Sequence, residues 1–316
     1  MRKFVIQLLL IVLFGTILVC PVITLQGAAT GLLLWYQVVL PTLFPFLILT
    51  NLLLKSQAFE CIGNTLGVLI GKCFRTSKSG SFAVIVGFLC GYPLGAKVIA
   101  DLHCKGLISQ QEAQYLLSFC NNSSPMFIVS FFVYQILQDS QYLFVTLLSL
   151  YAAPIILSFF TYRYYMHSTV PYTYNTKQCA ALAETPAVPK LRIMELLDSS
   201  IMDGVYIITK IGGYIMLFSI VIQLFLAWKG LPYTISQYLL PLLEVTSGLR
   251  LFQSISDSTL RYLCMIFLVS FGGFCAVAQT QCVLYQSPLR IVPYLIQKII
   301  TAIIAVIISS FLIYIL

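Results

Sequence analysis

Residues 80–110 read GSFAVIVGFLCGYPLGAKVIADLHCKGLISQ, an apolar run that breaks at Tyr92-Pro93 and then becomes charged. Residues 232–258 repeat this pattern as PYTISQYLLPLLEVTSGLRLFQSISDS, with Glu244 at the break. A re-entrant hairpin, in which a helix halts midway across a membrane and returns to its own side, accommodates both stretches. Irregular backbone at membrane depth is tolerated only inside protein or beside a wet cavity, so both breaks are candidate functional sites.

The composition places the chain in a lipid bilayer. Of its 316 residues, 59% are hydrophobic and only 9% are charged, whereas soluble proteins carry about 25% charged residues. Apart from the hairpins, seven apolar segments are long enough to cross roughly 30 Å of hydrocarbon as helices. They are residues 4–25, 31–54, 111–136, 141–162, 204–228, 260–286 and 291–316. The predicted fold class is therefore an all-α polytopic membrane protein with about seven spanning helices.

The formal charge of +8 indicates an orientation rather than a nucleic-acid partner, because the cytoplasmic loops of membrane proteins collect Lys and Arg. We place the N-terminus in the cytoplasm and let both hairpins return to their side of entry. All but Lys229, Arg250 and Arg261 of the 18 Lys and Arg then fall on or toward the inside. We therefore expect an integral membrane protein with a cytoplasmic N-terminus and an outer C-terminus.

The order span, hairpin, broken helix, span occurs twice, and the two copies have opposite orientations in this topology. Gly95 precedes Asn121 by the same number of residues as Ser247 precedes Gly273. The chain then divides into an N-terminal transmembrane helix, a first repeat, a cytoplasmic linker with an amphipathic helix, and a second, inverted repeat. These parts cover residues 1–30, 31–162, 163–203 and 204–316. An internal inverted repeat is typical of secondary transporters.

The broken helices, 111–136 and 260–286, carry the other signal. Residues 121–125 are Asn-Asn-Ser-Ser-Pro and residues 270–273 are Ser-Phe-Gly-Gly. Half-helix ends carry partial charges that can hold an ion. A single break more often serves close packing or a kink, but four breaks in repeat register favour one substrate site near the bilayer midplane. The candidate binding residues are Tyr92, Gly95, Lys97, Asn121, Asn122, Ser123, Ser124, Thr246, Ser247, Ser270, Gly272, Gly273 and Gln279.

Charged side chains at membrane depth are costly, so each is a functional hypothesis. Lys97 would meet a substrate carboxylate, unless it reaches cytoplasmic water or pairs with Asp101 four residues later. Glu244 would bind a proton or a cation, or would accept hydrogen bonds from a broken helix. No HExxH, GxSxG, P-loop or Cys/His metal spacing occurs, so we expect no enzyme, no cofactor and no metal site.

Four motifs together resemble a known family. GYPLGAKVIADL, SFCNNSSPMFI, LEVTSGLRLF and SFGGFCAVAQTQ occur in this order after VVLPTLFPFLI. They resemble the YlbJ-type sporulation integral membrane proteins of the nucleoside-recognition (Gate) domain family, whose organisation is similar to that of concentrative nucleoside transporters. The resemblance implies transport of dipicolinic acid, a planar pyridine dicarboxylic acid, from the mother cell toward the forespore across the outer forespore membrane.

For this small dianion, the resemblance favours Lys97 as the cation and Asn121, Asn122 and Ser123 as donors, with Tyr92 as a stacking face. Glu244 would repel a dianion, so it is assigned to a coupling ion or to the orientation of the second hairpin. Two alternatives stay open: a nucleoside or related metabolite as cargo, and a non-transporting membrane scaffold for sporulation partners. The coupling ion, whether proton or sodium, and a homo-oligomeric assembly also stay open.

Overall fold

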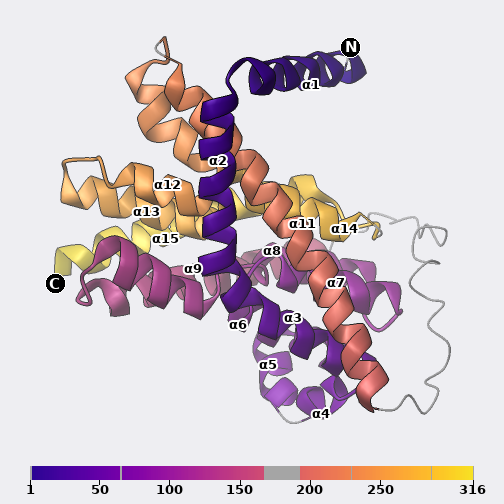
Figure 1. The fold of residues 1–316 in the computed structure, drawn as a ribbon. Helices are drawn as coiled ribbons and strands as arrows, with labels where there is room; N and C mark the ends of the chain where they lie inside the picture. Colours follow the sequence, from indigo (N-terminus) through magenta and orange to yellow (C-terminus); the bar gives the residue numbers. More distant parts are fainter. Residues whose placement is uncertain (1, 65, 167–192, 229, 286, 316) are drawn as a thin grey trace.

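The computed structural model describes residues 2–64, 66–166, 193–228, 230–285 and 287–315. Within these residues every regular element is a helix, and five helices are long and apolar enough to cross a membrane (Figure 1). They are Pro21–Lys55, Tyr142–Met166, Ile193–Ala227, Ser258–Leu284 and Ile291–Ile315. The all-helical fold class is confirmed, with five long candidate spans in this part of the chain instead of the expected seven.

The first two expected spans divide at a different place. Helix α1 ends at Val19, and the backbone leaves the helical region at Cys20, so the chain turns sharply into the next helix (Figure 1). That next helix is continuous from Pro21 to Lys55. Its wider π-helical turn ends at Val39, two residues before Pro41, which has no N–H to donate, and the helix continues through that proline. Its parts are α1 Arg2–Val19, α2 Pro21–Leu34, η1 Trp35–Val39 and α3 Leu40–Lys55.

Short helices follow, and the chain leaves the helical conformation at the turn of the predicted first hairpin and within the predicted first broken helix. The hairpin arms α6 and α7 are joined by a turn at Gly91, whose φ is +84°, and a cis Tyr92–Pro93 bond. Residues 111–136 form no through helix, because α8 ends at Phe119 and the π-helical η2 begins only at Phe127. The elements are α4 Phe59–Asn64, α5 Leu66–Phe74, α6 Lys78–Leu89, α7 Leu94–Cys104, α8 Gln110–Phe119, η2 Phe127–Leu137 and α9 Tyr142–Met166.

The second half begins earlier than expected. Residues 193–203, predicted as a separate amphipathic helix, continue directly into the following span, because neither Pro nor Gly interrupts the chain before Gly204. The rest of the predicted linker, residues 167–192, lies outside the described residues. The elements are α11 Ile193–Ala227, η3 Ile235–Leu239, η4 Leu240–Leu243, α12 Val245–Phe252, α13 Ser258–Phe271, α14 Gly273–Leu284 and α15 Ile291–Ile315.

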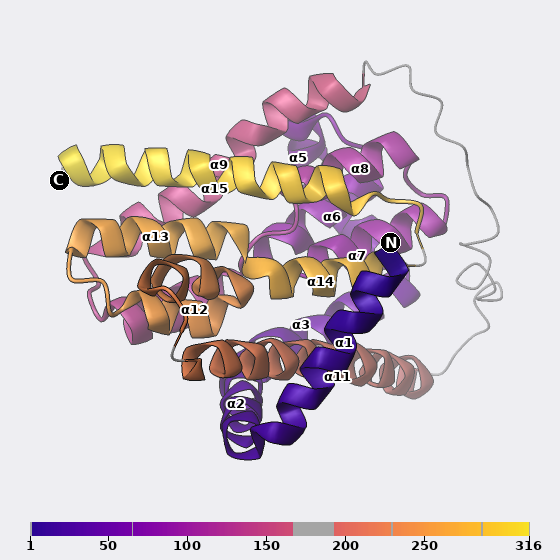
Figure 2. The ribbon, with the colours of Figure 1, turned by 90° about the horizontal axis from the view of Figure 1, so that it is seen from above.

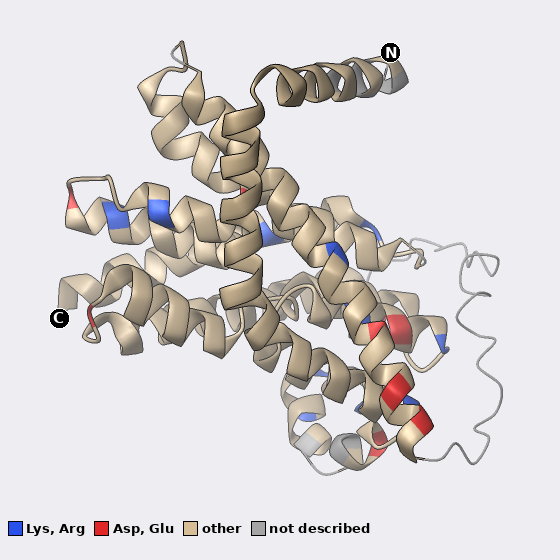
Figure 3. Cartoon of the chain, viewed as in Figure 1, with Lys and Arg blue, Asp and Glu red and all other residues tan. Residues whose placement is uncertain are grey.

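The long helices pack in antiparallel pairs. Helix α11 packs against α2 and α3 and runs in the opposite direction (Figure 1), and α15 packs in the same way against α9 (Figure 2). Helix α14 contacts α7, α11, α12 and α15, so the second broken helix lies between the two halves of the chain. Charged residues gather around the α4–α7 end and around the α12–α13 end, and the middle of the long helices carries few (Figure 3).

Candidate functional site

The first hairpin and the first helix break are joined through their backbones. The Tyr92 N–H donates a 2.7 Å hydrogen bond to the carbonyl oxygen of Asn122, and the Ala96 N–H donates to Asn121 Oδ1 at 3.3 Å. Gly95 lies so close to the break that a Cβ atom there would overlap the Cys120 carbonyl oxygen. The hairpin turn therefore supplies hydrogen-bond donors to the non-helical residues of the break, whose carbonyl groups are not paired within a helix.

Asn121 connects this break to the second half of the chain. Its amide Nδ2 donates to Thr280 Oγ1 at 3.0 Å and to the Tyr294 hydroxyl at 2.8 Å. With Ala96 on its Oδ1, the buried side chain has partners on α7, α14 and α15. Because three of its four hydrogen-bonding positions are used within the protein, Asn121 joins the two halves of the chain.

The two broken helices also touch directly. Helix α13 ends at Phe271, so the Val269 carbonyl has no helical donor four residues later. Ser123 Oγ donates to that carbonyl at 2.7 Å. Gly272, with φ of +87°, turns the chain at this point, and a Cβ atom there would lie 3.3 Å from Tyr92 Cε1. The Tyr92 ring from the first hairpin therefore covers the break of the second half.

Glu244 holds the second hairpin. It is 2% exposed and caps α12: its carboxylate accepts from the Thr246 N–H at 2.9 Å, the Ser247 N–H at 2.7 Å and Thr246 Oγ1 at 2.6 Å. The N-terminal end of a helix stabilises a negative charge, so this carboxylate is compensated without a cation. This geometry corresponds to the alternative in which Glu244 accepts hydrogen bonds from a helix break.

All four interruptions border one inner cavity of about 50 Å³. This inner cavity is closed in by both hairpins and both broken helices, and by residues of the Pro21–Lys55 helix and α11. Seven of the predicted residues line it: Tyr92, Ser123, Ser124, Glu244, Thr246, Gly272 and Gln279. Its other wall residues are mostly apolar positions that the sequence analysis did not single out, and they include Val39, Thr42, Leu43, Ile211, Ile215, Cys275 and Ala276.

The remaining predicted residues lie near the four interruptions but are not among the wall residues of the inner cavity. Asn122 Nδ2 donates to the Phe119 carbonyl at 2.6 Å and so caps the end of α8. Gly273 packs against the backbone of Leu242, whose carbonyl would be 3.2 Å from a Cβ atom. Ser247 caps nothing with its hydroxyl, which is buried without a partner in the described structure, and Ser270 is buried in α13.

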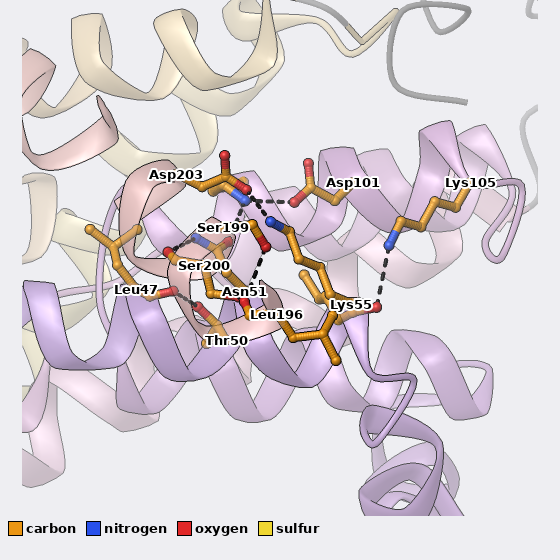
Figure 4. Close-up of polar contacts among 12 residues, drawn as sticks. Leu47, Thr50, Asn51, Lys55, Asp101, Lys105, Leu196, Ser199, Ser200 and Asp203 are labelled. Carbon is orange, nitrogen blue, oxygen red and sulfur yellow. Dashed lines mark hydrogen bonds and ion pairs between the residues drawn. The ribbon is translucent and has the colours of Figure 1, made fainter. Parts of the chain in front are cut away.

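Lys97 does not face the inner cavity. Its ammonium donates to Asp101 Oδ2 at 2.7 Å and to Asn51 Oδ1 at 2.9 Å, so the pairing that competed with a substrate role is present. Asn51 in turn donates to the Ser200 carbonyl at 3.4 Å, and Lys55 pairs with Asp203 at 2.7 Å. These contacts tie α3, α7 and α11 together (Figure 4).

Beside this network lies a larger open cavity, the vestibule, of about 540 Å³. Its walls come from α7, α11, α14 and the segment after α14. Gln279 and Ile211 line both the vestibule and the inner cavity, so the two spaces share a wall. The charged residues of the vestibule are Lys97, Asp101, Lys105, Asp203 and Lys210.

Sequence reasoning missed the most deeply buried cation. Lys298 was counted among the residues toward the cytoplasm, yet it is only 2% exposed on α15 and donates to Asn122 Oδ1 at 3.3 Å. In the part of the chain that the structure describes, no carboxylate pairs with it. The signal was available, because Lys298 follows Gln297 as the only charged residue within a 25-residue apolar helix.

The described residues contain no group of three or more His, Cys, Asp or Glu side chains that could hold a metal ion. No protein-family model matches the chain, and no solved structure matches it. A similar curated protein is the sporulation integral membrane protein YlbJ of Bacillus subtilis (strain 168), which is 28% identical over 323 residues. The chain is its homologue. The match covers 93% of this chain and 78% of YlbJ, so it includes both hairpins and both broken helices.

Proposed function

We propose that this chain is an inverted-repeat membrane transporter that moves a small organic anion, dipicolinate, from the mother cell toward the forespore during sporulation. The observation that carries the proposal is the meeting of four helix interruptions at one buried cavity. A scaffold has no need to open helices inside a membrane, where each unpaired backbone group costs several kcal/mol. A transporter uses such breaks to present backbone and side-chain partners to a substrate.

The inner cavity of about 50 Å³ has room for about one or two water molecules. It is therefore the closed form of the substrate site, and a dicarboxylate enters only when the hairpins and broken helices separate. The vestibule lies directly on the other side of Gln279, at the end where most of the basic residues gather. By the excess of Lys and Arg, we assign this end to the cytoplasm, with the outer face at the α12–α13 end.

The side chains around the inner cavity suit a planar anion. Ser124 offers a hydroxyl, Gln279 offers an amide, and Tyr92 offers a ring and a hydroxyl, while Ser123 lies in the same wall with its hydroxyl donating to the Val269 carbonyl. Glu244 is committed to α12, so we assign it to holding the second hairpin rather than to the substrate. The name of the relative supports the sporulation setting, and the choice of dipicolinate follows from the four motifs that resemble the YlbJ-type family.

The test is complementation in a spore-forming bacterium that lacks its own dipicolinate transporter. We expect the chain to restore dipicolinate to the spores, and we expect Ser123→Ala to reduce that content. Ser130→Ala is the matched control, since Ser130 is exposed and bonds only within its own helix turn. Spores without dipicolinate, from cells that make the full-length protein in the membrane, would contradict the proposal.

A second cargo of the same fold is separated by competition. In membrane vesicles that contain the chain, uptake of labelled nucleoside that excess dipicolinate does not reduce would identify a nucleoside transporter. A scaffold would show neither uptake nor a ligand-dependent rise in the melting temperature of the purified protein, because only a bound ligand stabilises the folded state by mass action.

A further inference from the structure

The vestibule carries two cations that the ion-pair network leaves over. Lys97 is paired with Asp101, and Asp203 is paired with Lys55. Of the lysines that line the vestibule, Lys105 and Lys210 pair with no carboxylate in the described part of the chain. Three lysines and two aspartates line this space, so its charge is positive before any ligand enters.

The two remaining lysines come from different walls. Lys105 follows the last residue of α7 and donates to the Leu54 carbonyl at 3.4 Å (Figure 4), a long bond to a neutral partner. Lys210 lies in α11 with its ammonium 4.1 Å from the centre of the Tyr206 ring. Neither contact neutralises the ammonium, so both cations remain available to an anion with two acidic groups.

Aromatic side chains accompany these cations. Tyr206 and Tyr214 lie on the same face of α11 as Lys210, four residues to either side of it, and Tyr285 lies across the vestibule after α14. The volume of about 540 Å³ falls in the range of about 300–1,000 Å³ that small-molecule sites occupy. The inner cavity is roughly a tenth of this size, so of these two adjoining spaces the vestibule is the one that can admit a planar dicarboxylate in this conformation.

We propose that the vestibule is an entry site that binds a small aromatic dicarboxylate between Lys105 and Lys210 before the inner cavity opens. The inference rests on the proposed function for its ligand, but it concerns a separate set of residues. Gln279 stands at the wall between the two spaces, so an anion held in the vestibule lies next to the path into the inner cavity.

The experiment measures equilibrium binding of dipicolinate to the full-length protein in nanodiscs of zwitterionic lipid by isothermal titration calorimetry. We expect the Lys105→Gln/Lys210→Gln double variant to raise the Kd by about tenfold or more, because each lysine contributes a charge-assisted hydrogen bond. Lys72→Gln/Lys78→Gln, which removes two exposed lysines outside the vestibule, is the control and keeps the wild-type Kd. Glutarate, a dicarboxylate without a ring, is expected to bind more weakly than dipicolinate.

An unchanged Kd in the Lys105/Lys210 double variant would overturn the entry site, even if the wild type transports dipicolinate. Displacement of dipicolinate by phosphatidylglycerol with no effect of either lysine would also overturn it. If proteoliposomes with the wild type take up no dipicolinate while the double variant alone loses binding, the transport proposal fails and the binding site stands. The two proposals therefore fail separately.

Discussion

Glu244 shows how one side chain holds a helix break in a membrane protein. Its carboxylate satisfies two backbone N–H groups at the start of α12 and the Thr246 hydroxyl. In Glu244→Gln the amide keeps one acceptor oxygen and brings an N–H₂ group against donors. We expect a loss of about 1 kcal/mol, which lowers the melting temperature by about 2–4 °C. Thermal unfolding in detergent measures it, and Asp198→Asn, an exposed carboxylate in α11, is expected to change little. An unchanged melting temperature in Glu244→Gln would contradict the capping role.

Lys298 is the second residue whose role the structure defines. A buried ammonium with one amide acceptor pays for desolvation without an ion pair, so replacement by an apolar side chain of similar length leaves stability equal or higher. We expect Lys298→Met to fold with an equal or higher melting temperature and to lose transport, because Asn122 loses its cation next to the hairpin. Lys72→Met, at an exposed position, is the control. Full transport by Lys298→Met would show that the ammonium group is not needed for transport and that this side chain only fills space between helices.

At the residue scale, the sequence located the uncharged polar residues of the inner cavity better than it located the charged residues. Tyr92, Ser123 and Gln279 stood out as polar residues at or after a break, and they line the cavity. Lys97 stood out for the same reason but lies in the vestibule, because its partner Asn51 is far away in the sequence. Long-range partners of this kind leave no periodic signal along the chain.

The helix break at Gly272 is the element on which the second half of the site depends. Its φ of +87° is in the left-handed region, and a Cβ atom there would press on the Tyr92 ring at 3.3 Å. We expect Gly272→Ala to destabilise the protein by at least about 1 kcal/mol. Gly213→Ala is a matched control, since Gly213 lies inside α11 with open space around it and the substitution favours the helix. Melting temperatures that move in the same direction for both variants would contradict this account of the break.

At the element scale, the interruptions were predictable and the lengths of the unbroken helices were not. Gly, Pro and Asn at the first hairpin and the first broken helix predict that the helices are interrupted there, because these residues lack a helical donor or favour other backbone conformations. The Pro21–Lys55 helix contains Pro41 and Pro45 and still continues, since its π-helical turn takes up the first.

The two halves of the molecule are joined beside the vestibule by Asn51. This buried side chain donates to the Ser200 carbonyl on α11 and accepts from Lys97 on α7. We expect Asn51→Leu to cost about 1–3 kcal/mol, because it leaves the Lys97 ammonium with one partner fewer at a half-buried position. Lys55→Gln, which removes a more exposed ion pair with Asp203, is expected to cost less than about 1 kcal/mol. An equal decrease in melting temperature in the two variants would contradict the view that Asn51 is the main link between the two halves at this place.

At the scale of the whole molecule, the sequence predicted that four breaks converge on one site, but it could not show which side chains face that site. The two hairpins and two broken helices could be aligned as repeats, but only the fold brings Glu244, Gly272 and Tyr92 to one cavity. Of the vestibule residues, only Lys97, Asp101 and Gln279 were singled out in the sequence, because its other lysine and tyrosine residues belong to α11 and to segments after α7 and α14 that are far apart along the chain.

The most direct test of transport through this cavity is the initial rate of labelled dipicolinate uptake by proteoliposomes that contain Gln279→Met. Gln279 lines both spaces, and its one hydrogen bond recorded in the described structure is to Cys275 Sγ, so the isosteric change preserves the fold. Loss of a hydrogen bond to a charged ligand costs about 1.5–3 kcal/mol, which predicts uptake about tenfold to a hundredfold slower than wild type. Gln135→Met, at an exposed position in η2, is expected to keep the wild-type rate. Uptake by Gln279→Met at the wild-type rate, or wild-type uptake no faster than in empty liposomes, would contradict the account.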